Sequence, residues 1–191
     1  MQFRHYIYLG YLIAIGLCPS CCCNKPVCPE FSVEEKSWMP NQENDTITFI
    51  SNLGNEVKFK ASPQVESKNY NNNKPKYGCP DYCSFNVSQN FNLINNLSHY
   101  THFYFQINKS KDVFNYTIGP SDNSFDLYFS LPKSIKSNSM VLGGKEYYDV
   151  YVTTVDTIRY SNAFYYKFYA TSKFGLLRFE NINQEYYERV F

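Results

Sequence analysis

The sequence predicts an all-β fold, an antiparallel sandwich or barrel of about nine to ten strands. Apolar and polar residues alternate with a period of two along most of the chain, as in half-buried strands. The chain also holds 19 Tyr and 16 Phe, and strands favour aromatic residues. Helical periodicity with caps is missing apart from a short candidate at 91–97. A parallel sheet, which needs crossover helices, is therefore not expected.

The first expected element is a hairpin. Ile47 and Phe49 alternate with threonines, and Val57 and Phe59 alternate with lysines. Between these strands the sequence Asn-Leu-Gly-Asn at 52–55 is typical of a turn. This pattern predicts a hairpin with one buried face.

Residues 62–77 contain prolines and a run of asparagines, which predicts a polar loop. Alternation then resumes, and the strands joined by short turns are expected to be antiparallel neighbours. The remaining predicted strands are centred on Phe85–Val87, Phe103–Ile107, Phe114–Ile118, Phe125–Leu131, Tyr148–Val152, Phe164–Phe168, Phe174–Phe179 and Tyr186–Phe191.

The first 20 residues have the pattern of a secretory signal peptide. Arg4 supplies a positive charge, and an uncharged run follows from Tyr6 to Leu17. Its length, about a dozen residues, suits the apolar core of a signal peptide (~7–15) and is short of the ~20 that span a membrane. We therefore expect residues 1–20 to be a cleaved signal peptide. An uncleaved N-terminal anchor is the alternative.

The run CPSCCC at Cys18–Cys23 resembles the lipobox of bacterial lipoproteins, in which a small residue precedes the cysteine that is acylated. Ser20 is that small residue, so the resemblance implies Cys21 as the lipid anchor, with Cys18 and Cys22 as fallbacks. The position three before Cys21 departs from the usual pattern, because it holds a cysteine where the family has an aliphatic residue. A disulfide knot or metal site is the alternative, although the pair-gap-pair spacing of zinc sites is absent.

A second resemblance lies at the C-terminal end. Gly175–Glu180 (GLLRFE), followed by an aromatic strand, is similar to the last hairpin of small uncharacterised bacterial cell-envelope lipoproteins. The two resemblances imply a protein anchored in the bilayer of the bacterial envelope by a palmitate-type acyl chain, facing the periplasm or the surface. We expect a lipidated tether over 21–37 and an all-β domain over 38–191, with Trp38 at its entry.

The charge balance argues against nucleic-acid binding. The chain has 18 basic and 17 acidic residues, and removal of the leader with Arg4 leaves equal numbers. Proteins that bind nucleic acid displace counterions with a basic excess, which this chain lacks.

Cys79 and Cys83 are separated by Pro-Asp-Tyr, and Pro80-Asp81 favours a turn that would bring them within disulfide range. We expect a local Cys79–Cys83 disulfide, formed in an oxidising compartment. Pairing of either cysteine with Cys28 and a redox-active pair are the alternatives.

No motif predicts an enzyme, a cofactor or a metal site. The preferred hypothesis is a binding or structural domain whose partner is a glycan, an envelope protein or an apolar ligand held inside a barrel. The alternative is an envelope hydrolase, for example one acting on glycans, which requires facing carboxylates or a histidine cluster. Asp-Thr-Ile sequences also mark Thr46 and Thr157 as candidate O-glycosylation sites.

Overall fold

The computed structural model describes residues 25–71, 80–94, 102–111, 113–120, 134–154 and 165–191. Cys21, Cys79, Thr157 and the strand expected at 125–131 lie outside these residues. The elements are β1 (Thr46–Ser51), β2 (Glu56–Ala61), β3 (Val65–Asn71), β4 (Tyr82–Leu93), β5 (His102–Ser110), β6 (Val113–Pro120), β7 (Ile135–Leu142), β8 (Lys145–Thr154), β9 (Tyr165–Thr171), β10 (Gly175–Asn181), β11 (Tyr186–Val190) and a short helix, α2 (Val33–Lys36).

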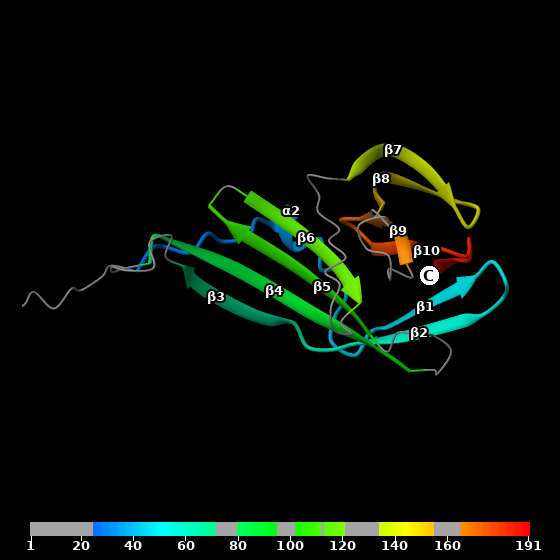
Figure 1. The fold of residues 1–191 in the computed structure, drawn as a ribbon, viewed down its shortest axis with the longest axis horizontal. Coiled ribbons are helices and arrows are strands. Elements are labelled where there is room, and N and C mark those ends of the chain that lie inside the picture. The colour runs from blue at the N-terminus through cyan, green and yellow to red at the C-terminus, as the bar shows by residue number, and fades with distance from the viewer. Residues whose placement is uncertain (1–24, 72–79, 95–101, 112, 121–133, 155–164) are drawn as a thin grey trace, which may run out of the picture.

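The 11 strands of the described residues belong to one antiparallel sheet, with the order β6-β5-β4-β2-β1-β11-β10-β9-β8-β7 and β3 paired with β4. The sheet curls into a half-barrel (Figure 1). β4 is the longest strand: its first part pairs with β3 and its last residues pair with β2. The predicted all-β antiparallel class is therefore confirmed, and its form is one curled sheet.

The inner face of the sheet holds the main core. Ile47 and Phe49 on β1 and Val57 and Phe59 on β2 are all buried, so the predicted hairpin and its buried face are confirmed. Four phenylalanines from distant strands form a closed set of ring contacts with centroids 5.1–6.0 Å apart: Phe49, Phe59, Phe103 and Phe179. Beside this set the core leaves a space of only about 10 Å³, too small to hold more than a water molecule.

Two local predictions were wrong. β3 lies within the segment expected to be a loop, and its side chains are almost all exposed. Because β3 buries neither face, its sequence shows no alternation of apolar and polar residues that could predict a strand. Backbone pairing with β4 stabilises it instead. Within the helix candidate at 91–97, Phe91–Leu93 instead continue β4.

An N-terminal strap, residues 28–45, lies against the inner face of the half-barrel. Phe31 packs on Phe85 with ring centroids 5.0 Å apart. Trp38, 5% exposed, lies between Tyr116 of β6 and Tyr151 of β8, at 4.8 and 5.2 Å. The strap thus joins the two ends of the sheet, which the strand order places far apart.

The helix α2 fastens the middle of the strap. Ser32 and Glu35 form a reciprocal capping box at its start. Glu35 also forms an ion pair of 2.7 Å with Lys109 of β5. Burial alone would raise the pKa of Glu35, but the bonds and charge of Lys109 and the contacts to Ser32 lower it. The carboxylate therefore serves both the helix and its docking on the sheet.

The strap bears on two expectations. Phe31 is buried and Cys28 is disulfide-bonded, so the described part of the segment expected to be a tether packs against the sheet. The prediction of a Cys79–Cys83 disulfide was wrong. Cys83 bonds instead to Cys28, the alternative partner, with Cα atoms 4.8 Å apart. Cys83 is an inward-facing residue of an extended strand, so its thiol meets the strap that crosses that face.

A smaller cluster forms where the β7–β8 hairpin bends. Asp149 adopts a positive φ of 52° in the middle of β8. Val150, Tyr147 and Leu142 of this hairpin pack with Tyr169 and Leu177, separately from the main core. The bend therefore allows the hairpin to cover side chains of β9 and β10 that the main core does not reach.

We predict that peptide mapping without reduction will find Cys28 linked to Cys83. Replacing both in a Cys28→Ser, Cys83→Ala protein should lower the free energy of unfolding by about 2–4 kcal/mol, because the bond closes a loop of 55 residues in sequence. Urea denaturation measures the change. A Cys79–Cys83 peptide, or unchanged stability, would contradict this assignment.

Candidate functional site

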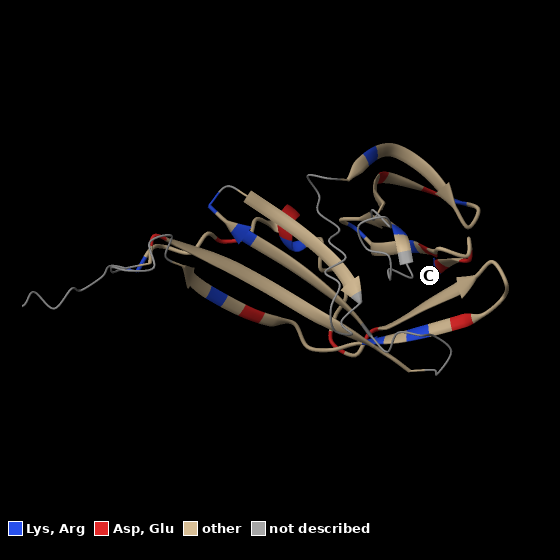
Figure 2. Cartoon of the chain, in the orientation of Figure 1, with Lys and Arg blue, Asp and Glu red and all other residues tan. Residues whose placement is uncertain are grey.

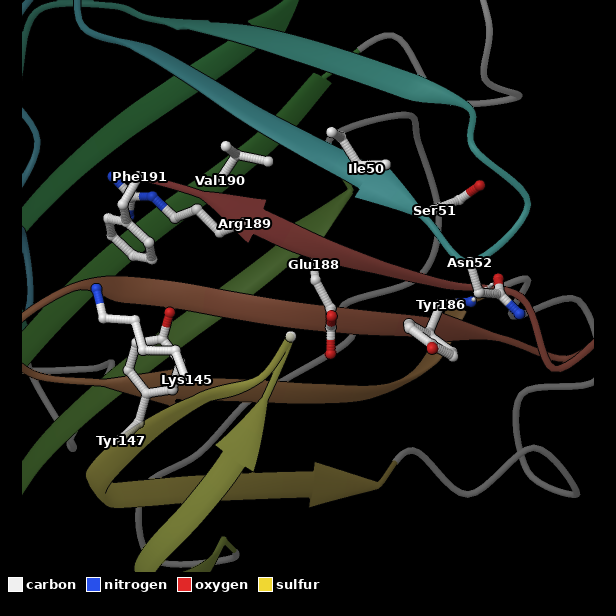
Figure 3. Close-up of a pocket in the computed structure, with 11 residues that line it drawn as sticks. Ile50, Ser51, Asn52, Lys145, Tyr147, Tyr186, Glu188, Arg189, Val190 and Phe191 are labelled. Atoms are coloured by element: carbon white, nitrogen blue, oxygen red, sulfur yellow. Dashed lines mark hydrogen bonds between the residues drawn. The ribbon is translucent and has the colours of Figure 1, made fainter.

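An open groove of about 400 Å³ lies on the outer side of the sheet (Figure 3). We call it the outer groove. It lies where β1, β11 and the turn of the β7–β8 hairpin meet. Its lining residues are Ile50, Ser51, Asn52, Gly143, Lys145, Tyr147, Tyr186, Glu188, Arg189, Val190 and Phe191.

Alternation along β11 directs side chains to the groove. Tyr187 is buried and stacks on Phe179 with an interplanar angle of 11°, so its neighbours Tyr186 and Glu188 belong to the opposite face. Figure 3 shows Glu188 between Tyr186 at one end and Lys145 at the other. The register of one strand thus sets the polar floor of the groove.

The hairpin turn approaches this floor closely. Gly143 has a positive φ of 58°, and a Cβ atom there would lie 2.9 Å from Oε2 of Glu188. A larger residue would be strained in backbone and would press on the carboxylate. Glycine is therefore favoured at this turn by its positive φ, and a side chain there would shift the end of Glu188.

Arg178 on β10 lies directly opposite Glu188 of β11, on the same face of the sheet. Its guanidinium lies 3.8 Å from the ring centroid of Tyr186 and donates to Glu188 Oε1 at 3.2 Å. It also pairs with Glu180 at 2.7 Å. Because one cation holds a ring and two carboxylates, the positions of Tyr186 and Glu188 are fixed before any ligand arrives.

Glu180 lies under this array and is buried. It accepts a 2.7 Å hydrogen bond from the Tyr169 hydroxyl and a 3.2 Å bond from Tyr166. Burial, and then the hydrogen bond to Glu180, raise the pKa of Tyr169 far above that of a free tyrosine. Tyr169 therefore remains a hydrogen-bond donor throughout the physiological pH range.

The other end of the groove is aromatic and cationic. The ammonium of Lys145 lies 4.8 Å from the ring centroid of Phe191 and 5.5 Å from that of Tyr147. Burial, followed by the charge of Glu188, raises the pKa of Tyr147. This end thus offers ring faces, a neutral hydroxyl and an ammonium to a ligand.

The rim near Asn52 is ordered by hydrogen bonds. Asn52 Oδ1 accepts from the backbone N–H of Tyr186 at 3.1 Å, which ties the β1–β2 turn to β11. Nearby, burial would raise the pKa of Glu185, but hydrogen bonds from Tyr187, Asn55, Ser51 and Asn181 lower it. The turn is therefore held in place on both of its sides.

The sequence-predicted sites do not gather here. Thr46 is exposed at the start of β1, and Cys83 lies in the disulfide at the strap. Two carboxylates do converge beside the groove, where Glu180 and Glu188 both pair with Arg178. The groove residues were missed, although the polar positions 186 and 188 on an aromatic strand were a signal that could have indicated them.

No family model, curated protein or solved structure matches this chain. The described residues contain no cluster of His, Cys, Asp and Glu able to hold a metal ion. Among those same residues, no helix has the length and apolar character to cross a membrane.

The free energy of unfolding should fall at alkaline pH because the hydroxyl of Tyr187 loses its proton more readily in the unfolded chain. Burial, and then its hydrogen bond to Glu185, raise the pKa of Tyr187 to about 12 in the folded protein, whereas an unfolded tyrosine titrates near ~10. Its contribution is therefore complete below pH ~10 and is lost as the pH rises from there toward the folded value. In urea titrations over this range, Tyr187→Phe should lose less stability than the unchanged protein. Parallel losses would contradict the assignment.

Proposed function

We propose that this chain is an exported, membrane-anchored lipoprotein of the bacterial cell envelope whose β domain binds a glycan in the outer groove. The observation that carries the first half is the Cys28–Cys83 disulfide. Structural disulfides persist in oxidising compartments and are rare in the cytosol of most bacteria. The bond thus supports the export predicted from the leader, and the lipobox-like run with Cys21 precedes it directly in sequence.

The groove supports the second half. Its volume is within the ~300–1,000 Å³ typical of small-molecule sites, and polar groups converge on ring faces. The carboxylate of Glu188 can accept hydrogen bonds from hydroxyl groups, and the amide nitrogen of Asn52 can donate to them. The rings of Tyr147 and Tyr186 supply flat apolar surface. A sugar has both kinds of surface, hydroxyls at its edge and C–H groups on its face.

The main core gives no comparable support for an apolar ligand. The space among its phenylalanines is about 10 Å³, and it is enclosed by packed rings such as Phe91 and Phe105, with centroids 4.4 Å apart. An apolar guest in the described part of the interior would have to displace these rings. A partner at the outer surface is therefore favoured.

Acylation is tested by metabolic labelling with radioactive palmitate. We expect Cys21→Ala to lose the label and to leave the membrane fraction, because the modified thiol is removed. Cys23→Ala, which changes a cysteine of the same run outside the predicted anchor positions, is the matched control and should keep both label and membrane association. Label retained by Cys21→Ala would transfer the anchor to a neighbouring cysteine, and an unlabelled wild-type protein would contradict the lipoprotein proposal.

Glycan binding is tested by calorimetry with soluble oligosaccharides released from envelope peptidoglycan. Glu188→Gln should weaken binding about tenfold or more, since a hydrogen bond to a charged group contributes ~1.5–3 kcal/mol. Glu66→Gln, which alters an exposed carboxylate on β3, should bind as the wild type does. Equal affinity in all three proteins, or no binding by the wild type, would contradict the glycan proposal; cleavage of the oligosaccharide would instead identify a hydrolase.

A further inference from the structure

The disulfide determines where the chain leaves the folded domain. Cys28 is bonded to Cys83, the second residue of β4, and Cys83 pairs with Tyr70 near the end of β3. We call this part the near end, made up of residues 25–30, 66–71, 81–85, 111 and 113. In Figure 1 the first described residues lie here, at one extreme of the long axis, and the β1–β2 turn lies at the other.

The chain between the expected anchor and the domain is short. Cys28 follows Cys21 by seven positions, which span at most about 25 Å when fully extended and about 15 Å as a flexible coil. β4 alone has 12 residues, a length of about 40 Å. A domain anchored through Cys21 therefore cannot turn its β1–β2 end toward the bilayer, because the connection is shorter than β4.

The surface of the near end has the side chains expected at a lipid headgroup layer. Lysines lie over aromatic rings in three pairs: Lys25 on Tyr70, Lys68 on Phe85 and Lys111 on Tyr82, at 5.3–5.8 Å. Such pairs place an apolar stem and ring beside a charged tip, and both residue types are found at membrane interfaces. Val27 and Val113 are also exposed, at 94% and 54%.

The residues of the near end that the structure describes carry no excess of one charge. Lys25, Lys68 and Lys111 are offset by Glu30, Glu66 and Asp81 on the same part of the molecule, and Figure 2 shows both signs there. Attraction to anionic lipids is thus a small contribution. The orientation of the domain on the membrane would follow from the short connection between Cys21 and Cys28 and from the lysine–aromatic pairs. High salt should therefore not change that orientation.

We propose that the near end rests on the bilayer surface and that the disulfide directs the outer groove away from it. This rests on the proposed acylation of Cys21. The groove includes Asn52 of the β1–β2 turn and lies at the opposite end of the long axis from Cys28 (Figure 1). The protein would then present its groove to the glycan layer, with the length of β4 as the spacer.

Lysine acetylation of the acylated full-length protein on phosphatidylcholine vesicles tests the proposal. The comparison is a variant with twelve Gly and Ser residues inserted between Asn24 and Lys25, which keeps the anchor but lets the domain move away. Lys25 and Lys111 should react at least fivefold more slowly in the unmodified protein than in the variant. Lys58 and Lys145, near the groove, should react equally in both, at low and at high salt.

The two proposals fail in different ways. A protein that carries no lipid and does not float with the vesicles contradicts the acylation. A protein that floats, but whose Lys25 and Lys111 react equally with and without the spacer, overturns the orientation. Slower reaction of Lys58 or Lys145 in the unmodified protein than in the spacer variant also overturns the orientation. The domain would then lie on its far end or on its side.

Discussion

The structure depends on the strap that closes the inner face of an unclosed sheet. A sheet that curls halfway leaves its apolar inner face open along one side, and an exposed apolar face is unfavourable in water. Here Phe31 and Trp38 cover that face and connect β6 with β8 through ring contacts. The disulfide at Cys28 holds the strap at one end, and Arg189 bonds to Asn41 at the other. Order in the half-barrel therefore depends on the strap staying in place.

The same arrangement separates two faces with different roles. At the main core the inner face is filled by packed rings, which leave a space of only about 10 Å³ among the described residues. The outer face near β11 instead carries a charged and aromatic array organised by Arg178. The β7–β8 hairpin, in which Asp149 has a positive φ, lies beside that array and contributes Gly143, Lys145 and Tyr147 to the groove. Packing of the core and lining of the groove thus use alternate residues of one strand.

Sequence patterns predicted those parts in which one face is buried. The hairpin of β1 and β2 was confirmed because Phe49 and Phe59 alternate with polar residues, and burial requires that period. β3 was missed because both of its faces are polar. The strap was missed as well, although the Ser32 to Glu35 capping box is a local signal, since Phe31 reveals its burial only when the sheet is present. The groove draws on Lys145 and Glu188, which are far apart in the sequence, so local pattern could not join them.

By itself the sequence determined the fold class and the strands with one apolar face, because alternation and turn residues act over a few neighbouring positions. Only the tertiary structure decided the partner of Cys83, the place of the strap and the site around Glu188. These features depend on which distant segments meet when the sheet curls. Which segments meet depends on the order of the strands and on the positive φ of Asp149. Neither can be predicted from a short stretch of residues.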